Sequence, residues 1–175
     1  MAHDSPWQVI DTDRLTLRRF TADDAPFVFA LFNDPSFIRF IGDRGVRDSA
    51  GARAYIEERF IDAYGTSGIG PFVVVLKATR VSIGFCSLFR RDWLDDVDLG
   101  FAFLPPWRRH GYAYEAADAL LDYARSALGL QRLVAFSNLD NDASTRLLGR
   151  LGFAPAGLIR PPGEAADVQF FSAQL

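Results

Sequence analysis

The chain of 175 residues has very few of the side chains that form disulfides or bind metals. Cys86 is the only cysteine, which excludes an intramolecular disulfide and fits a reducing compartment. His3 and His110 are the only histidines, so we expect no catalytic metal. Lys77 is the only lysine among 19 basic residues, a bias that indicates genomic composition more than function.

The chain also lacks a long hydrophobic run and an excess of basic charge. Its apolar runs, such as residues 72–76, are far shorter than the roughly 18 residues that span a bilayer. The N-terminus has no basic stretch followed by an apolar one, as a signal peptide would. Lys and Arg number 19 against 22 Asp and Glu, whereas a general nucleic-acid binder needs a basic excess. We therefore expect a cytoplasmic protein with neither a membrane nor a nucleic acid as its partner.

What is present is the composition of an ordinary globular domain, 49% hydrophobic and 23% charged. No repeat, low-complexity tract or linker interrupts it, so we expect one domain over residues 1–175. Hairpins dominate before Pro105 and helices fall between strands later, which predicts an α/β fold with a mixed sheet of about six or seven strands and about four helices. The expected strands are 7–11, 15–19, 71–77, 81–89, 96–104, 131–136, 153–159 and 168–173; the expected helices are 21–32, 50–64 with Ser49 as N-cap, 111–128 and 141–151.

The strand expected at 96–104 has two unlike faces. Its bulky apolar residues alternate with Asp98 and with two very small residues, Gly100 and Ala102. The small-residue face therefore leaves room for something besides protein. A carboxylate there can serve as a general base, but Asp98 could equally pair with an arginine or cap the hairpin.

The segment 108–113 lies between the end of that strand and a long helix. Free backbone N–H groups and the positive end of the helix dipole make such a place an anion site. Gly111 would let the backbone approach a phosphate closely, and Arg108 and Arg109 supply charged donors. The alternative is that Gly111 is only a turn residue beside solvated arginines.

A second polar segment, 138–144, precedes the helix expected at 141–151. Asparagine at a helix start is usually a cap, which is the simplest interpretation of Asn141. Ser144, one turn into the helix, could likewise bond its own backbone. Neither residue indicates a function alone.

Together, however, the two segments resemble the GNAT (N-acetyltransferase) superfamily, especially its RimJ/RimL-like branch. The family pattern Arg/Gln-x-x-Gly-x-Gly/Ala is matched by Arg108, Gly111 and Ala113. The later pattern Asn-x-x-Ser…Leu-Gly-Phe is matched at 141, 144 and 151–153. Residues 12–18 are similar to the branch's opening strand and 81–85 to its third strand, so the resemblance covers nearly the whole chain in order.

The resemblance implies transfer of an acetyl group from acetyl-CoA to a primary amine, by direct attack in a ternary complex. Family members hold the CoA pyrophosphate on backbone amides of the glycine loop. They place the thioester carbonyl near an amide of the fourth strand, which stabilises the developing negative charge, and the pantetheine arm near the later asparagine. The residues assigned to CoA in this way are Phe101, Ala102, Phe103, Arg108, Arg109, His110, Gly111, Tyr112, Ala113, Asn141 and Ser144.

For catalysis, the resemblance places Asp98 where many relatives have a glutamate base, and its shorter side chain suggests a relay through water. Many relatives protonate the departing thiolate with a tyrosine, but Leu148 occupies that position here. Ser144 matches the serine used by RimL-like members. The identity of the general acid is therefore left open. Glu164 is a weaker candidate for the base.

The acceptor is expected to be the α-amine of a peptide or protein. Residues 33–35 and 39–40 match the branch's stretch beside the acceptor cleft. An α-amine has a pKa near 7.7–8.0 and is partly neutral, whereas a lysine amine, near 10.4, is almost wholly charged. Two alternatives stay open: a small-molecule acceptor such as an aminoglycoside or polyamine, and a catalytically silent module that binds acyl-CoA. A homodimer is one option for the assembly.

Overall fold

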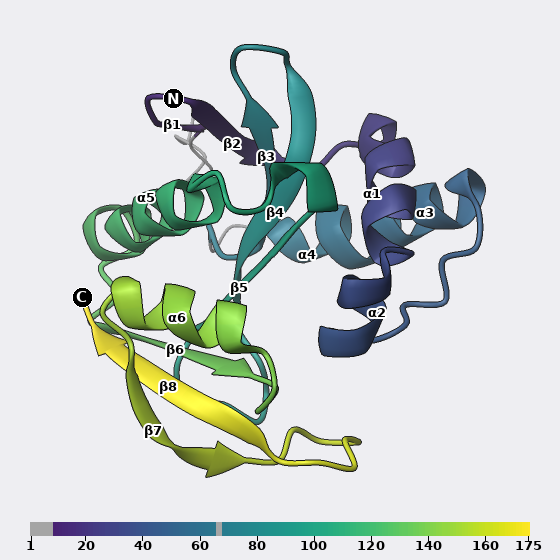
Figure 1. The fold of residues 1–175 in the computed structure, drawn as a ribbon. Helices are drawn as coiled ribbons and strands as arrows, with labels where there is room; N and C mark the ends of the chain where they lie inside the picture. Colours follow the sequence, from purple (N-terminus) through teal and green to yellow (C-terminus); the bar gives the residue numbers. More distant parts are fainter. Residues whose placement is uncertain (1–8, 66–67) are drawn as a thin grey trace.

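The computed structural model describes residues 9–65 and 68–175. The described residues form one eight-stranded sheet, in which every neighbouring pair is antiparallel except β5 with β6 (Figure 1). The expected mixed sheet is confirmed, and the opening strand and the closing hairpin both join it. Residue 7, in the first expected strand, and His3 lie outside the described residues. In sheet order, the strands are β1 Ile10–Asp11, β2 Leu15–Arg19, β3 Pro71–Leu76, β4 Val81–Phe89, β5 Asp98–Phe103, β6 Arg132–Ser137, β8 Val168–Gln174 and β7 Ala154–Ile159.

The helices form two groups on opposite faces of the sheet (Figure 1). The long α5 and the amphipathic α6 cover one face, and the N-terminal helices cover the other. β3 and β4 therefore lie between two apolar layers, which explains why 72–76 is a continuous hydrophobic run rather than an alternating one. Within the described residues, no helix has both the length and the apolar composition needed to cross a membrane. The α-helices are α1 Ala25–Phe32, α2 Pro35–Phe40, α3 Ser49–Tyr55, α4 Asp62–Tyr64, α5 Tyr112–Ser126 and α6 Asp142–Arg150.

The second expected helix differs from the prediction at its start and in its interior. Asp48, not Ser49, is the N-cap, and its carboxylate accepts a hydrogen bond of 2.7 Å from the N–H of Gly51. Both residue types cap well, but the negative charge also interacts favourably with the helix dipole. The expected continuous helix is interrupted by a π-helical segment, Ile56–Ile61, before α4. No glycine or proline in the sequence marks that change.

The short helix α2 is not among the helices expected from the sequence; the Asn-Asp-Pro sequence at 33–35 follows the end of the first expected helix at residue 32. In the structure the same residues also start α2. The carboxylate of Asp34 accepts a hydrogen bond of 3.2 Å from the N–H of Phe37, and Pro35 occupies the first helical position. An acidic cap followed by proline is a known start signal, so the sequence contained the information.

Candidate functional site

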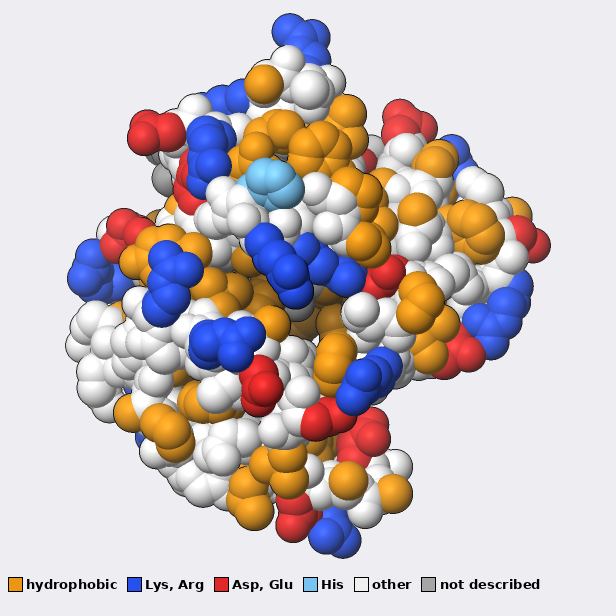
Figure 2. Space-filling model, viewed as in Figure 1, with side chains coloured by type: hydrophobic (Ala, Val, Ile, Leu, Met, Phe, Trp, Pro, Cys, Tyr) orange, Lys and Arg blue, Asp and Glu red, His pale blue; other side chains and the backbone are white. Residues whose placement is uncertain are grey.

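The candidate site is a cleft that opens where β5 and β6 part. Among the described residues, these parallel strands share one matched pair, Asp98 with Val134, next to a hydrogen bond of 3.0 Å from the N–H of Val134 to the carbonyl of Val97. Beyond that pair the strands diverge toward their carboxyl ends. Figure 2 shows a hollow in the middle of the surface that faces the viewer, with basic side chains on its rim and hydrophobic side chains deeper inside.

Backbone alternation decides which amides of β5 face the cleft. The N–H of Leu104 donates to the carbonyl of Ile83 on β4, so alternate residues, including Ala102, also point toward β4. The backbone groups of Phe101 and Phe103 point the other way, toward β6. Of the three amides expected at the thioester carbonyl, those of Phe101 and Phe103 thus face the opening and that of Ala102 does not.

The glycine loop leads from β5 into α5. Gly111 is the N-cap of α5 with a φ of 81°, a left-handed conformation that favours glycine. Arg109 also has a positive φ, 64°, although it carries a side chain. The first three backbone N–H groups of α5, those of Tyr112, Ala113 and Tyr114, have no acceptor within the helix. The expected convergence of amides at the start of this helix is therefore present.

A contact from the N-terminal hairpin braces this loop. Arg14 donates from Nη1 to the carbonyl of His110 at 3.0 Å and from Nε to Glu115 at 2.6 Å. Its guanidinium also lies 4.5 Å from the centre of the Tyr112 ring, which stacks against His110. The side chains of His110 and Tyr112 thus pack against each other beside the loop. Sequence reasoning missed this brace, because Arg14 and Glu115 are 101 positions apart.

The two arginines expected at the phosphate have different surroundings. Arg109 is exposed at the loop. Arg108 turns away: its Nε donates to the carbonyl of Phe103 at 2.8 Å, and its other nitrogens bond Ser36 at 3.2 Å and Asp34 at 2.6 Å. Arg108 therefore joins the end of β5 to α2, and Arg109 is the arginine left free to meet an anion.

Asn141 and Ser144 lie at the start of α6, on the β6 side of the cleft. Asn141 is the N-cap of α6, and its Oδ1 accepts a hydrogen bond of 3.2 Å from the N–H of Ser144. Ser144 is half-buried. Leu148 is 1% exposed and belongs to the core. Position 148 therefore offers no hydroxyl group that could protonate a departing thiolate.

Asp98 lies at the vertex of the cleft, where β5 and β6 still pair. It is buried, and its carboxylate accepts hydrogen bonds from Arg91 of 2.8 Å and 3.4 Å. Burial raises the pKa of Asp98 above its ordinary value, and the positive charge of Arg91 opposes part of that rise. The Arg91 guanidinium also lies over the rings of Phe89 and Phe136, at 5.3 Å and 5.2 Å. The pairing of Asp98 with an arginine, one of the two sequence-based alternatives, is thus observed.

Other candidates from the sequence lie elsewhere. Cys86 is fully buried, and burial raises the pKa of its thiol, as expected of a core residue rather than a nucleophile. Glu164 is exposed in the turn between β7 and β8. Asp92 and Asp95 are exposed in the loop before β5, whereas Asp96 forms an ion pair of 3.3 Å with Arg132.

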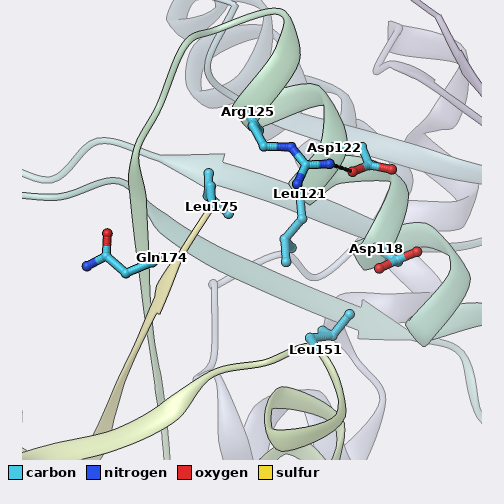
Figure 3. Close-up of a pocket in the computed structure, with 7 residues that line it drawn as sticks. All are labelled: Asp118, Leu121, Asp122, Arg125, Leu151, Gln174 and Leu175. Atoms are coloured by element: carbon cyan, nitrogen blue, oxygen red, sulfur yellow. Dashed lines mark hydrogen bonds and ion pairs between the residues drawn. The ribbon is translucent and has the colours of Figure 1, made fainter.

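A separate pocket of about 190 Å³ lies between α5 and the end of β8 (Figure 3). The residues from α5 that line it belong to its middle and C-terminal part, away from Gly111, so the pocket is not part of the cleft. Arg125 and Asp122 pair across one side of it at 2.6 Å. Its lining consists of Asp118, Leu121, Asp122, Arg125, Leu151, Gln174 and Leu175.

Comparison with known proteins points to one family. The family described as the acetyltransferase (GNAT) domain matches residues 14–154. Over 155 residues the chain is 31% identical to the uncharacterised N-acetyltransferase YoaA of Bacillus subtilis, covering 87% of this chain and 86% of that protein.

Two solved structures that are named for different activities show the same fold. The RimL ribosomal L7/L12 alpha-N-protein acetyltransferase, in complex with coenzyme A, has a TM-score of 0.82 at 16% identity, covering 96% of this chain and 98% of that one. A chimera of the spermidine N-acetyltransferase SpeG from Vibrio cholerae and hSSAT has a TM-score of 0.74 at 18% identity, covering 93% and 96%. At these identities the likeness establishes the fold.

The Arg91–Asp98 pair gives a pH-dependent prediction for stability. Replacing Arg91 with Gln leaves a buried carboxylate without its cation, and should lower the free energy of unfolding near pH 7 by about 1–3 kcal/mol, less than for a fully buried pair because Arg91 is partly exposed. Because folding raises the pKa of Asp98, the folded protein binds a proton on this carboxylate at a higher pH than the unfolded chain does. The deficit should therefore be smaller at a mildly acidic pH than near pH 7.

Urea unfolding midpoints at both pH values measure this effect. The control is Arg160→Gln, which removes an exposed pair with Asp167 and should cost under about 0.5 kcal/mol at either pH. A deficit of Arg91→Gln that is equal at the two pH values would contradict the buried, pH-sensitive pairing.

Proposed function

The chain belongs to the GNAT acetyltransferase family and is an N-acetyltransferase; from this premise we propose that it transfers the acetyl group of acetyl-CoA to the α-amine of a peptide or protein, by direct attack in a ternary complex. The observation that carries the proposal is the parting of β5 and β6 after Asp98 and Val134, directly beside the start of α5. That arrangement offers an open strand edge for an acyl group and a set of backbone donors for a phosphate.

The residues around the cleft fit a CoA thioester. The amides at the start of α5 and the exposed Arg109 suit the pyrophosphate, because Gly111 has no side chain to hold a phosphate away. Acetyl-CoA, when bound, supplies an activated acyl group on a thiol that leaves easily. The N–H of Phe101 is suited to donate to the carbonyl oxygen, where negative charge develops. Asn141 would contact the pantetheine arm.

Two side chains are proposed for proton transfer. The acceptor must lose a proton to attack, and Asp98 would receive it through a relayed water, since its carboxylate is buried and held by Arg91. Ser144 would donate a hydrogen bond to the departing thiolate, in place of the tyrosine that Leu148 replaces. Little help is needed at that step, because a CoA thiol is acidic.

An α-amine suits these groups better than a lysine amine does. A carboxylate that acts through water is a modest base, and an α-amine is already partly neutral at working pH. The fold of the RimL alpha-N-protein acetyltransferase supports this choice. A small polyamine or aminoglycoside is the second candidate, favoured by the SpeG-like fold and by the exposed Asp92 and Asp95, which would attract a cation.

The glycine loop predicts how acetyl-CoA affinity depends on Gly111. Replacing Gly111 with Ala forces a side chain into a left-handed conformation, and its Cβ would lie 3.3 Å from Nη2 of Arg14. The loop should shift, and acetyl-CoA should bind at least about tenfold more weakly by calorimetry. Gly129, at the other end of α5, has a similar φ of 66° with open space around it. Gly129→Ala should therefore cost stability without changing the affinity, and equal affinities of both variants would refute the assignment of the loop.

The proposed base predicts a change in the pH–rate profile. Asp98→Asn should lower turnover by about 10²-fold or more and flatten the acid limb of the profile, while acetyl-CoA affinity stays nearly constant. Ser144→Ala should cost less. Steady-state rates between about pH 6 and pH 9 measure both effects. If Asp98→Asn matches the wild-type rate over that range, Asp98 is not the base.

The acceptor is tested by competition. Short peptides with free and with blocked N-termini are offered with acetyl-CoA beside a set of aminoglycosides and polyamines, and release of the CoA thiol is followed together with the mass of each product. We expect the free-N-terminus peptides to be acetylated fastest and the blocked ones not at all. Faster acetylation of an aminoglycoside or polyamine would overturn the peptide proposal. Failure of every amine tested would contradict both proposed acceptor classes.

A further inference from the structure

The N-terminal hairpin of β1 and β2 lies against α5, the helix that the glycine loop begins (Figure 1). Arg14, in the turn of this hairpin, reaches the loop itself: its Nη1 donates to the carbonyl of His110 at 3.0 Å. Its guanidinium also lies 4.5 Å from the centre of the Tyr112 ring. The loop is therefore held from outside, by a residue that belongs neither to β5 nor to α5.

The contact with Arg14 determines the direction of one peptide group. The peptide between His110 and Gly111 is trans, so its carbonyl and its N–H point in opposite directions. Because the carbonyl of His110 faces Arg14, the N–H of Gly111 faces away from Arg14. Among the described residues no acceptor is found for that N–H, which leaves it available to a ligand beside the free N–H groups of the first turn of α5.

The conformation of the loop depends on support from its surroundings. Gly111 and Arg109 both have left-handed backbones, with φ values of 81° and 64°, and the side chain of Arg109 disfavours that conformation. A backbone of this kind persists only where other contacts fix it. Within the described part of the chain, Arg14 is the only donor found for the carbonyl of His110.

Glu115, in the first turn of α5, holds Arg14 in place. Its carboxylate accepts from Nε of Arg14 at 2.6 Å, from the backbone N–H of Arg14 at 2.9 Å and from the hydroxyl of Thr12 at 2.6 Å. Burial would raise the pKa of Glu115, but these hydrogen bonds lower it below its usual value, so the carboxylate is charged at neutral pH. The guanidinium of Arg14 is thus oriented although its side chain is 46% exposed.

We propose that Arg14, held by Glu115, is a positioning residue for the acyl donor: it fixes the carbonyl of His110 and so directs the N–H of Gly111 to the pyrophosphate of acetyl-CoA. Without this hydrogen bond the peptide between His110 and Gly111 can turn over, which would present a carbonyl oxygen to the phosphates in place of a donor. Arg14 therefore acts on the end of the donor that carries the phosphates and not on the thioester. The inference rests on the proposed transfer from acetyl-CoA, whereas the orientation of the peptide is a property of the free protein.

Two acetyl donors of different length test where Arg14 acts. Acetyl-CoA carries the pyrophosphate, and S-acetylpantetheine lacks it. In Arg14→Gln, acetyl-CoA should bind about five- to tenfold more weakly by calorimetry, with a KM raised by the same factor and kcat nearly unchanged. The kcat/KM for S-acetylpantetheine should stay at the wild-type value. An equal loss with both donors, or an unchanged affinity for acetyl-CoA, would overturn the proposal.

The matched control is Lys77→Gln, which also removes one positive charge from the surroundings of this hairpin. Lys77 donates to the carbonyl of Thr12 and pairs with the exposed Asp11 at 3.2 Å, instead of with the loop. The variant should bind acetyl-CoA as the wild type does. A loss as large as that of Arg14→Gln would mean that charge near the hairpin, and not the bond to His110, sets the affinity.

Glu115→Gln separates positioning from direct attraction of the phosphates. If Arg14 supplied only positive charge, removal of the neighbouring negative charge would strengthen acetyl-CoA binding or leave it unchanged. A glutamine, however, offers one acceptor oxygen to the three donors that now share two, so Arg14 loses its fixed orientation. The proposal therefore predicts binding about two- to fivefold weaker in Glu115→Gln. Equal or tighter binding would overturn the positioning role.

Relaxation dispersion of the Gly111 amide in the free protein tests the peptide itself. Exchange between two orientations should broaden this signal in Arg14→Gln and not in the wild type or in Lys77→Gln. The same relaxation in all three proteins would contradict the fixed peptide. If the wild type does not bind acetyl-CoA at all, the proposed function fails, and this measurement still decides whether Arg14 fixes the peptide.

Discussion

The parting of two parallel strands is the constraint on which the rest of this structure depends. A buried backbone amide without a partner is costly, so a sheet does not open at its centre unless other groups occupy the opening. Around this one, Arg91 holds Asp98 at the vertex, Arg108 takes the carbonyl of Phe103, and α2 spans the far side. The backbone N–H of Phe101 faces the opening, where it can donate a hydrogen bond to a carbonyl oxygen of a ligand.

Several charged residues near the cleft are therefore structural supports rather than chemical groups. Arg108 fits the family pattern for a phosphate loop, yet its donors are taken by Phe103, Ser36 and Asp34. Arginine suits this role because its planar fork reaches several acceptors at once. In the function proposed here, the amides of the glycine loop carry the anion site, with the exposed Arg109 beside them. A motif can thus be matched while one of its residues serves the fold.

The sequence predicted what local chemistry determines. The strand with alternating faces, the glycine that starts α5 and the asparagine that caps α6 all follow from residue types and spacing. Contacts between distant positions could not be predicted this way: Arg14 with Glu115, or Arg39 with Asp140, are each 101 positions apart and exposed in part. Asp98 lies between these cases, since its pattern left both a base and an ion pair open, and only the fold brings Arg91 to it.

Asn141 shows how one side chain can serve both the fold and the site. Its Oδ1 caps α6 by accepting from the N–H of Ser144. Aspartate caps a helix as well as asparagine does, and its charge would favour the dipole more, so capping alone does not explain the amide. The side chain of an aspartate has no N–H group to donate, whereas Asn141 keeps its Nδ2 as a donor while its Oδ1 accepts the capping hydrogen bond. In the acetyl transfer proposed for this cleft, a neutral cap would also add no negative charge near the leaving thiolate. The amide of Asn141 is thus compatible with that proposal while its observed role is to start a helix.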